Sequence, residues 1–176
     1  FLRLGSRAAV DKALSRFVEE GFIQRIARGV FVRPKQSRFV GAVMPGTQQV
    51  LEVIAKKHGE TIQVHGAEAA RRFKLTTQVP TTPVFYTSGP NRELKIGNLT
   101  VKLKHVSPRK LRLSGTRPGL ALSTLWYLGK EAVNTEVLQT IRNGLSSEEF
   151  ETLKSTDMPA WMSEALRGFD KDVNHA

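Results

Sequence analysis

Basic and hydroxyl side chains that could contact nucleic acid gather near the start of the chain, between residues 6 and 33. The candidate DNA contacts are Ser6, Arg7, Lys12, Ser15, Arg16, Arg25 and Arg28. Arginine and lysine bind phosphate oxygens, and arginine also reads base edges in the major groove. The chemistry that these residue types predict is recognition of duplex DNA, by a helix in the groove and a nearby turn on the backbone.

The first element that must position these side chains is a helix over residues 6–20. Ser6 is a suitable N-cap, because its hydroxyl can accept a hydrogen bond from a free amide of the first turn. Apolar residues recur at Val10, Leu14 and Phe17–Val18, the spacing of one buried stripe. Gly21 supplies the left-handed residue that commonly ends a helix.

A short antiparallel hairpin is predicted to follow the helix. Residues 22–23 and 30–32 are β-rich, and Ala27–Arg28–Gly29 can turn between them. A cationic helix followed by a hairpin is the order of elements in a winged helix-turn-helix, with recognition helix 6–20 and wing 22–33. The same order also occurs in small domains that bind no DNA, so the charge balance must help to decide.

Charge is segregated along the chain. Residues 1–38 carry nine Lys/Arg and three Asp/Glu, a net charge of +6; residues 39–130 carry fourteen and four, a net charge of +10. Residues 131–176 carry four and nine, a net charge of −5, and the three sections sum to the overall +11. A basic body with an acidic tail favours a polyanionic partner for the first two sections.

Other features of the sequence bound the class of protein. The absence of cysteine excludes disulfides and thiolate metal sites. No apolar run approaches the roughly 20 residues of a membrane span, and no signal-like segment is visible, so we expect a cytoplasmic protein without membrane partners. The chain starts with Phe1, and a recognition helix at residue 6 leaves no room for a preceding helix. We therefore expect a fragment that lacks the first helices of its DNA-binding unit.

The remaining residues, 39–176, predict a small mixed α/β domain with a helical end. Residues 33–38 form a polar connector, and residues 39–44 are too short an apolar run to classify. Helices are expected from a cap at Thr47 to about His58, with Val50, Leu51, Ile54 and Ala55 as the buried stripe, and over 66–73 and 118–128. Three more are expected: one capped by Asn134 or Thr135 and ending at Gly144, one that starts with the signature of residues 146–149 and continues past Leu153, and one with Pro159 in its first turn that reaches Phe169. Strands are expected at 61–64, 84–87, 93–96 and 99–105. The predicted fold class is α+β, with a partial winged helix over residues 1–38.

A second basic surface is predicted around the last of these strands. It comprises Lys102, Lys104, Arg109, Lys110 and Arg112. These side chains could contact phosphates, or they could dock an acidic protein such as a toxin. Aromatic residues do not alternate with them, so stacking on single-stranded bases is disfavoured.

No arrangement of residues predicts catalysis. Gly5–Ser6 with Asp11 resembles the start of a nucleotidyltransferase motif, but that motif needs two carboxylates one residue apart, and the neighbours of Asp11 are Val10 and Lys12. His58, His65 and His105 lack the helical spacing of metal ligands. The sequence predicts neither an enzyme nor a metal or other cofactor.

Three separated blocks resemble one known family. They are LGSRAAVDKALSRFVEEGFIQRIARGVFVRP, GAEAARRFKLTTQVPTTPVFYTSGPNRELKIG and KHVSPRKLRLSG, in that order along the chain. Together they resemble the AbiEi-type antitoxins, and more closely the DUF6088 branch found beside nucleotidyltransferase-like toxins. The resemblance extends from Leu4 to about Trp161.

This resemblance implies a bacterial antitoxin of a type IV-like toxin–antitoxin system, active in abortive infection and phage defence. It would repress its own operon through the winged helix, and its α/β domain, most of all residues 66–110, would neutralise the toxin. Apart from the resemblance, we expect a dimer on inverted repeats, because two-fold symmetric proteins read two-fold symmetric sites. The alternative is a protein-interaction module whose basic hairpin docks an acidic partner without specific DNA binding. The residues leave both functions open.

Overall fold

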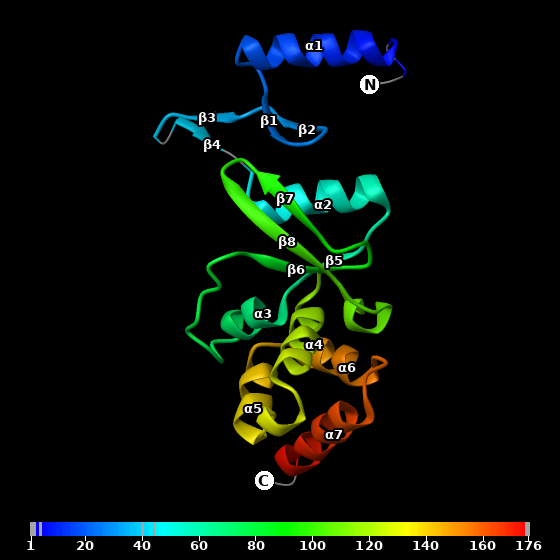
Figure 1. The fold of residues 1–176 in the computed structure, drawn as a ribbon. Helices are drawn as coiled ribbons and strands as arrows, with labels where there is room; N and C mark the ends of the chain where they lie inside the picture. Colours follow the sequence, from blue (N-terminus) through cyan, green and yellow to red (C-terminus); the bar gives the residue numbers. More distant parts are fainter. Residues whose placement is uncertain (1–2, 4, 40, 44, 175–176) are drawn as a thin grey trace. The chain divides into compact units, whose positions relative to one another are not determined.

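The computed structural model describes residue 3 and residues 5–39, 41–43 and 45–174. The fold is mixed α+β, as predicted (Figure 1). The α-helices are α1 (Arg7–Glu19), α2 (Thr47–His58), α3 (Gly66–Arg72), α4 (Arg117–Leu128), α5 (Thr135–Asn143), α6 (Ser147–Ser155) and α7 (Ala160–Asn174). Two short 3-10 helices are η1 (Pro108–Leu111) and η2 (Lys130–Ala132).

The strands form two short ribbons and one four-stranded sheet. They are β1 (Gln24–Ala27), β2 (Val30–Val32), β3 (Lys35–Ser37), β4 (Gly41–Val43), β5 (Ile62–Val64), β6 (Val84–Thr87), β7 (Arg92–Ile96) and β8 (Leu99–His105). Strands β1–β2 and β3–β4 are antiparallel pairs, and the larger sheet has the order β5-β6-β8-β7. In this sheet β6 runs antiparallel to β5 and parallel to β8.

The chain divides into two compact units. The first unit comprises Phe1–His58 and Leu94–Thr100, and the second comprises Gly59–Glu93 and Val101–Ala176. The first unit thus includes α2 and the tip of the β7–β8 hairpin in addition to α1 and the ribbons.

A small apolar core holds the hairpin and α2 of the first unit together. Ile26 and Val30 of the hairpin are buried against Val50 and Ile54 of α2, and Leu94 packs beside them. The predicted apolar stripe of α2 is therefore confirmed. Thr47 is the first residue of α2 rather than its cap, and the amide of the preceding Gly46 donates to Gln49 Oε1 at 3.2 Å.

The second unit has the larger core, built by its helices. Buried side chains from α4, α5, α6 and α7 form one continuous cluster that includes Leu122, Ile141, Phe150 and Met162. The helix starts agree with the sequence: Asn134 caps α5, and Ser146 forms a complete capping box with Glu149. The prediction of a helical C-terminal part is confirmed.

Two local predictions near the first hairpin were wrong. Strand β1 begins at Gln24, not at residue 22, because Phe22 and Ile23 turn back to hydrogen-bond the Phe17 carbonyl at the end of α1. Residues 35–37, predicted as a connector, form β3, which pairs with residues 41–43. The pairing is made by backbone hydrogen bonds, so the polar side chains of β3 gave no sign of it.

Among the described residues, none of the helices combines the length and the apolar character that crossing a membrane requires.

Candidate nucleic-acid interface

The first unit carries most of the protein's net positive charge. Its residues include twelve Lys/Arg and four Asp/Glu, a net charge of +8, whereas the second unit carries fifteen and twelve, a net charge of +3. The candidate DNA contacts all lie in the first unit. This net charge favours the binding of a polyanion by the first unit.

Helix α1 forms as its caps predict. The Ser6 hydroxyl accepts from the Ala9 amide at 3.3 Å, and Gly21, at φ +75°, follows the last turn. The predicted stripe is present, but it is not buried: no α1 residue is buried, and the side chains of Phe17 and Val18 are 39% and 36% exposed. The periodicity correctly predicted that these residues share one face of the helix. The prediction that this face is buried was wrong, because no other described residues cover it.

The candidate contacts on α1 lie on different sides of the helix. An α-helix advances about 100° per residue, which puts Arg7 opposite Arg16. Arg7 lies 4.0 Å from the Asp11 carboxylate, and Arg16 lies 3.7 Å from that of Glu20 with its guanidinium 5.7 Å from the centre of the Phe17 ring. Ser6 is engaged as the cap, so its hydroxyl already has a structural role.

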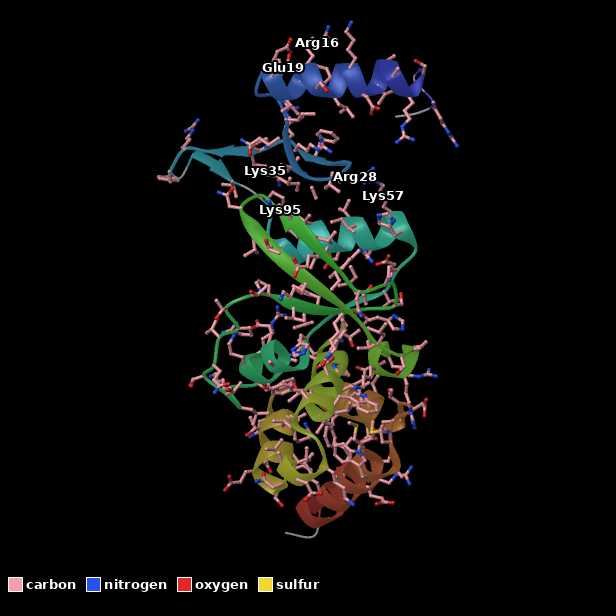
Figure 2. The ribbon with its side chains drawn as sticks, viewed as in Figure 1. Arg16, Glu19, Arg28, Lys35, Lys57 and Lys95 are labelled. Carbon is pink, nitrogen blue, oxygen red and sulfur yellow. The ribbon has the colours of Figure 1, made fainter. Side chains whose placement is uncertain are left out.

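Lys12, Ser15 and Arg16 share one side of α1. Together with Ala9, Ala13 and Glu19 they line a shallow hollow of about 460 Å³. Figure 2 shows Arg16 and Glu19 projecting from this helix. The small side chains of Ala9 and Ala13 leave the backbone of this side accessible, so it is the side of α1 best suited to enter a groove.

The β1–β2 hairpin presents its two arginines to solvent. Ile26 points into the core, so the neighbouring Arg25 points outward, opposite Phe31 in the ladder. Arg28 lies in the turn itself and is exposed, and Gly29 completes the turn at φ +69°. Both predicted wing residues therefore have guanidinium groups that can reach a phosphate.

The end of α2 adds cations that the sequence analysis did not assign to the interface. Lys56, Lys57 and His58 form its last turn and are exposed. A Cβ atom built on Gly29 would lie 2.7 Å from Lys57 Nζ, so this ammonium group lies at the hairpin turn (Figure 2). The Lys56–Lys57 pair was visible in the sequence as two adjacent cations. Its position near Arg28 could not be predicted, because it depends on the packing of α2 against the hairpin.

From Gln24 onward, the cations of the first unit are almost uncompensated by carboxylates. They are Arg25, Arg28, Arg33, Lys35, Arg38, Lys56, Lys57 and Lys95, here called the cationic set. All eight are exposed, and the one carboxylate in the same segments, Glu52, accepts a hydrogen bond from Gln48. In the described part of the chain the first unit's ion pairs are the two on α1, so none involves the cationic set. Such a surface attracts a polyanion.

In the predicted second basic surface, in the second unit, the two arginines share one carboxylate. Arg109 and Arg112 both pair with Asp157, at 3.0 and 3.6 Å, and Arg109 also donates to the Met158 carbonyl. The ammonium of Lys110 lies 4.6 Å from the centre of the Trp126 ring, and Lys102 pairs with Glu93. Lys104 has no ion-pair partner among the described residues. The structure therefore does not gather these five side chains into one free cationic patch.

Groups that could hold a metal are absent from the described residues, where no cluster of three His, Cys, Asp or Glu side chains occurs. His65 caps α3 through Nδ1, and His105 Nδ1 lies 2.9 Å from the Gly89 carbonyl oxygen. These contacts give both histidines local structural roles.

Fold and surface together define a mixed α+β protein with a strongly cationic helix-and-hairpin unit. The chain belongs to the family described as "Family of unknown function (DUF6088)", which matches residues 1–153. This match confirms the DUF6088 part of the resemblance seen in the sequence. No curated protein and no solved structure matches the chain.

Proposed function

We propose that the protein binds duplex DNA through its first unit, acting as the antitoxin of a toxin–antitoxin system and repressing its own operon. The observation that carries the DNA-binding part is the cationic set: eight exposed Lys/Arg side chains accompanied by a single carboxylate. Such a surface binds DNA favourably, because each phosphate that a Lys or Arg neutralises releases condensed cations from the DNA.

In this proposal α1 and the β1–β2 hairpin act as the recognition helix and wing of a winged helix. The side of α1 that bears Lys12, Ser15 and Arg16 would face base edges, and Arg25 and Arg28 would rest on phosphates. Lys56 and Lys57 would add phosphate contacts next to those of the wing, along the DNA backbone. The protein would bind as a dimer to inverted repeats, because a two-fold symmetric dimer matches a two-fold symmetric DNA site.

The antitoxin role depends on the family resemblance. The toxin partner would be nucleotidyltransferase-like, and the second unit would neutralise it in the bacterial cytoplasm. Co-expression of the full chain with the neighbouring gene product tests this role: growth should be restored by the wild-type chain, and failure to restore it would remove the antitoxin role.

The alternative, an interaction module that docks an acidic partner through the second basic surface, has less support. Arg109 and Arg112 already share the carboxylate of Asp157, and Arg109 also donates a hydrogen bond to the Met158 carbonyl. A partner would have to displace these pairs before using the cations. No such ion pair among the described residues would have to be displaced for DNA to bind the cationic set.

Binding to labelled DNA from upstream of its own gene, with a scrambled duplex as control, tests DNA recognition directly. Both duplexes are titrated across a salt series. We expect the native duplex to bind at least roughly 10³-fold tighter than the scrambled one, with affinity falling steeply as salt rises. Equal affinity for both would reduce the function to non-specific phosphate binding, and no binding at moderate salt would favour the interaction module.

A further inference from the structure

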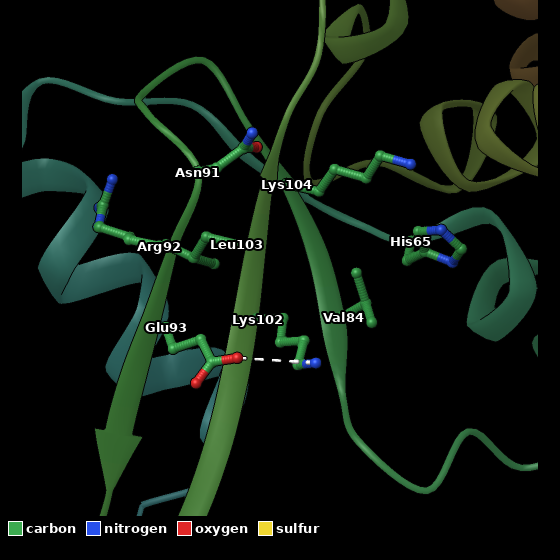
Figure 3. Close-up of a pocket in the computed structure, with 8 residues that line it drawn as sticks. All are labelled: His65, Val84, Asn91, Arg92, Glu93, Lys102, Leu103 and Lys104. Carbon is green, nitrogen blue, oxygen red and sulfur yellow. Dashed lines mark ion pairs between the residues drawn. The ribbon is translucent and has the colours of Figure 1, made fainter.

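One face of the four-stranded sheet contains a hollow of about 560 Å³ that belongs wholly to the second unit. The polar residues that line it are His65, Asn91, Arg92, Glu93, Lys102 and Lys104 (Figure 3), and Arg92 is already paired with Glu60 at 2.7 Å. Its volume falls within the roughly 300–1,000 Å³ typical of small-molecule sites. The DNA-binding proposal makes no use of it.

Strand register places two lysines over this hollow. Lys102 is paired with Val84 and Lys104 with Tyr86 in the parallel β6–β8 ladder, so both lysines point to the same face of the sheet. Val101 and Leu103 point to the opposite face and are buried. Figure 3 shows Lys104 extending past β6 to the side on which His65 lies, whereas Lys102 lies between β8 and β6 with its ammonium paired with Glu93.

His65 offers a third donor to the same space. Its Nδ1 accepts a hydrogen bond from the Ala67 amide at 3.2 Å, so the neutral ring carries its proton on Nε2. The ring is held by Tyr86 and Tyr127, with centroids 4.7 and 5.9 Å away. Its orientation is therefore fixed by packing as well as by the cap that it provides to α3.

The charge of the hollow is positive and weakly compensated. Lys102 lies 3.6 Å from Glu93, but these side chains are 55% and 62% exposed, and ion pairs of this kind contribute little. Lys104 has no carboxylate partner among the described residues. Burial, followed by the charge of Lys104, lowers the pKa of His65, so its ring is neutral at neutral pH.

We propose that this hollow binds a phosphate group through Lys102 and Lys104, with His65 Nε2–H as the third donor. A phosphate fits this set better than a carboxylate, because it presents three acceptor oxygens and up to two negative charges to three separated donors. The phosphate could come from a free phosphorylated molecule or from a nucleic-acid backbone. The site stands on its own and does not depend on DNA binding by the first unit.

Titration of the full chain with inorganic phosphate, followed by NMR of the histidine rings, tests the proposal. Bound phosphate should shift the His65 signal saturably and raise the pKa of His65, because an adjacent anion favours the imidazolium. The other titratable groups that act on or contact the ring are Lys104 on β8, Tyr86 on β6 and Tyr127 on α4; Glu68, on the helix that His65 caps, is paired with Arg71 and Arg72. His65→Asn identifies the signal and retains a side chain able to cap α3.

Two matched variants separate a site from general charge screening. Lys104→Gln should weaken phosphate binding by about tenfold, the effect of losing one charged hydrogen bond. Lys130→Gln removes an exposed cation of the same unit that does not line the hollow, and it should leave binding unchanged. Equal losses in both variants, or a shift that does not saturate, would overturn the proposal.

A mononucleotide and a short duplex, titrated with the same variants, distinguish the two sources of phosphate. Tighter binding of the mononucleotide would identify a free ligand, and tighter binding of the duplex would identify the backbone; either result supports the site if Lys104→Gln weakens it. A glutamate-rich peptide that binds where neither phosphate probe does would overturn the proposal.

Discussion

A methyl group on Gly29 would lie 2.7 Å from the ammonium of Lys57, so the hairpin turn meets the last turn of α2. Arg28, the residue beside Gly29, therefore belongs to the same surface as the cations that end α2. The two elements are held together by Ile26 and Val30 packing on Val50 and Ile54. This packing turns two separate basic stretches of sequence into one surface.

We predict that Arg28→Ala and Lys57→Ala each weaken DNA binding for all sequences alike. Each removes a phosphate contact, so the slope of log affinity against log salt should fall in magnitude by about one. Fluorescence anisotropy with native and scrambled duplexes at several salt concentrations measures both effects. Lys130→Ala, which removes an exposed cation from the second unit, is the matched control; a slope reduced equally by all three variants would show that only net charge matters.

The two arginines of α1 should behave differently from each other. Arg16 shares its side of the helix with Lys12 and Ser15, whereas Arg7 lies opposite. We expect Arg16→Ala to cost about 1–3 kcal/mol of binding to the native duplex and to relax its preference over the scrambled one. Arg7→Ala should change binding by less than about 0.5 kcal/mol. Competition between the duplexes measures the preference, and equal losses would show that this side of α1 does not enter the groove.

The sequence predicted the local elements well, because their signals are local. The N-caps at Ser6 and Ser146 and the apolar stripe of α2 lie within a few residues of the structure that they specify, and the cap of α5 is Asn134, one of the two residues predicted for it. The β7–β8 hairpin was equally clear, because Gly97 provides the positive φ of its turn between two alternating segments.

Features that depend on contacts between distant residues could not be predicted in this way. The role of His65 as an N-cap was missed because its imidazole is a less usual capping group than a hydroxyl or carboxylate. Arg109 and Arg112 share one partner, the carboxylate of Asp157, which lies more than 40 residues further along the chain. A count of charges along the sequence could not reveal these ion pairs. The placement of Lys57 beside Gly29 likewise depends on packing that no local pattern contains.

Two glycines lie where α4 is closely approached, Gly66 by α3 and Gly119 by the segment that precedes α4. A Cβ atom on Gly66 would overlap the Cβ of Tyr127 and lie 2.6 Å from the Ser123 carbonyl oxygen, and one on Gly119 would overlap the Leu113 carbonyl. These neighbours are backbone carbonyl groups and a Cβ atom bonded directly to the backbone, so they cannot move without moving the chain. Gly66→Ala and Gly119→Ala should therefore each lower the free energy of unfolding by at least ~2 kcal/mol, measured by urea denaturation.

Gly168 is the matched control for these substitutions. It lies within α7, and nothing surrounds the position of its Cβ within 4 Å. Gly168→Ala should raise the free energy of unfolding by about 0.5–1 kcal/mol, because alanine loses less backbone entropy in a helix. If Gly66→Ala were as stable as Gly168→Ala, the contact between α3 and α4 would not constrain this position.

Glu68 should make the stability of the protein depend on acid pH. Hydrogen bonds from Arg71, at 2.6 and 2.8 Å, and secondarily from Arg72, lower the pKa of Glu68 below its ordinary value of 4.5, against an opposing effect of burial. Because the folded-state pKa is the lower one, the stabilisation is complete above the unfolded-state pKa and is lost as the pH falls through the folded-state pKa. Glu68→Gln should therefore cost about 0.5–1 kcal/mol at pH 7, a range that allows for solvent screening of the exposed arginines, and almost nothing once Glu68 is protonated.

Urea denaturation of wild type and Glu68→Gln at pH 7 and at pH 3 measures this gap and its closure. Glu164→Gln is the control, since Glu164 is an exposed residue of α7 that forms no ion pair with the described residues. Its substitution should have a small effect of the same size at both values of pH. A gap for Glu68→Gln that stayed constant between pH 7 and pH 3 would mean that the substitution acts through packing or helix propensity, because an interaction of the carboxylate with Arg71 and Arg72 must weaken when that carboxylate takes up a proton.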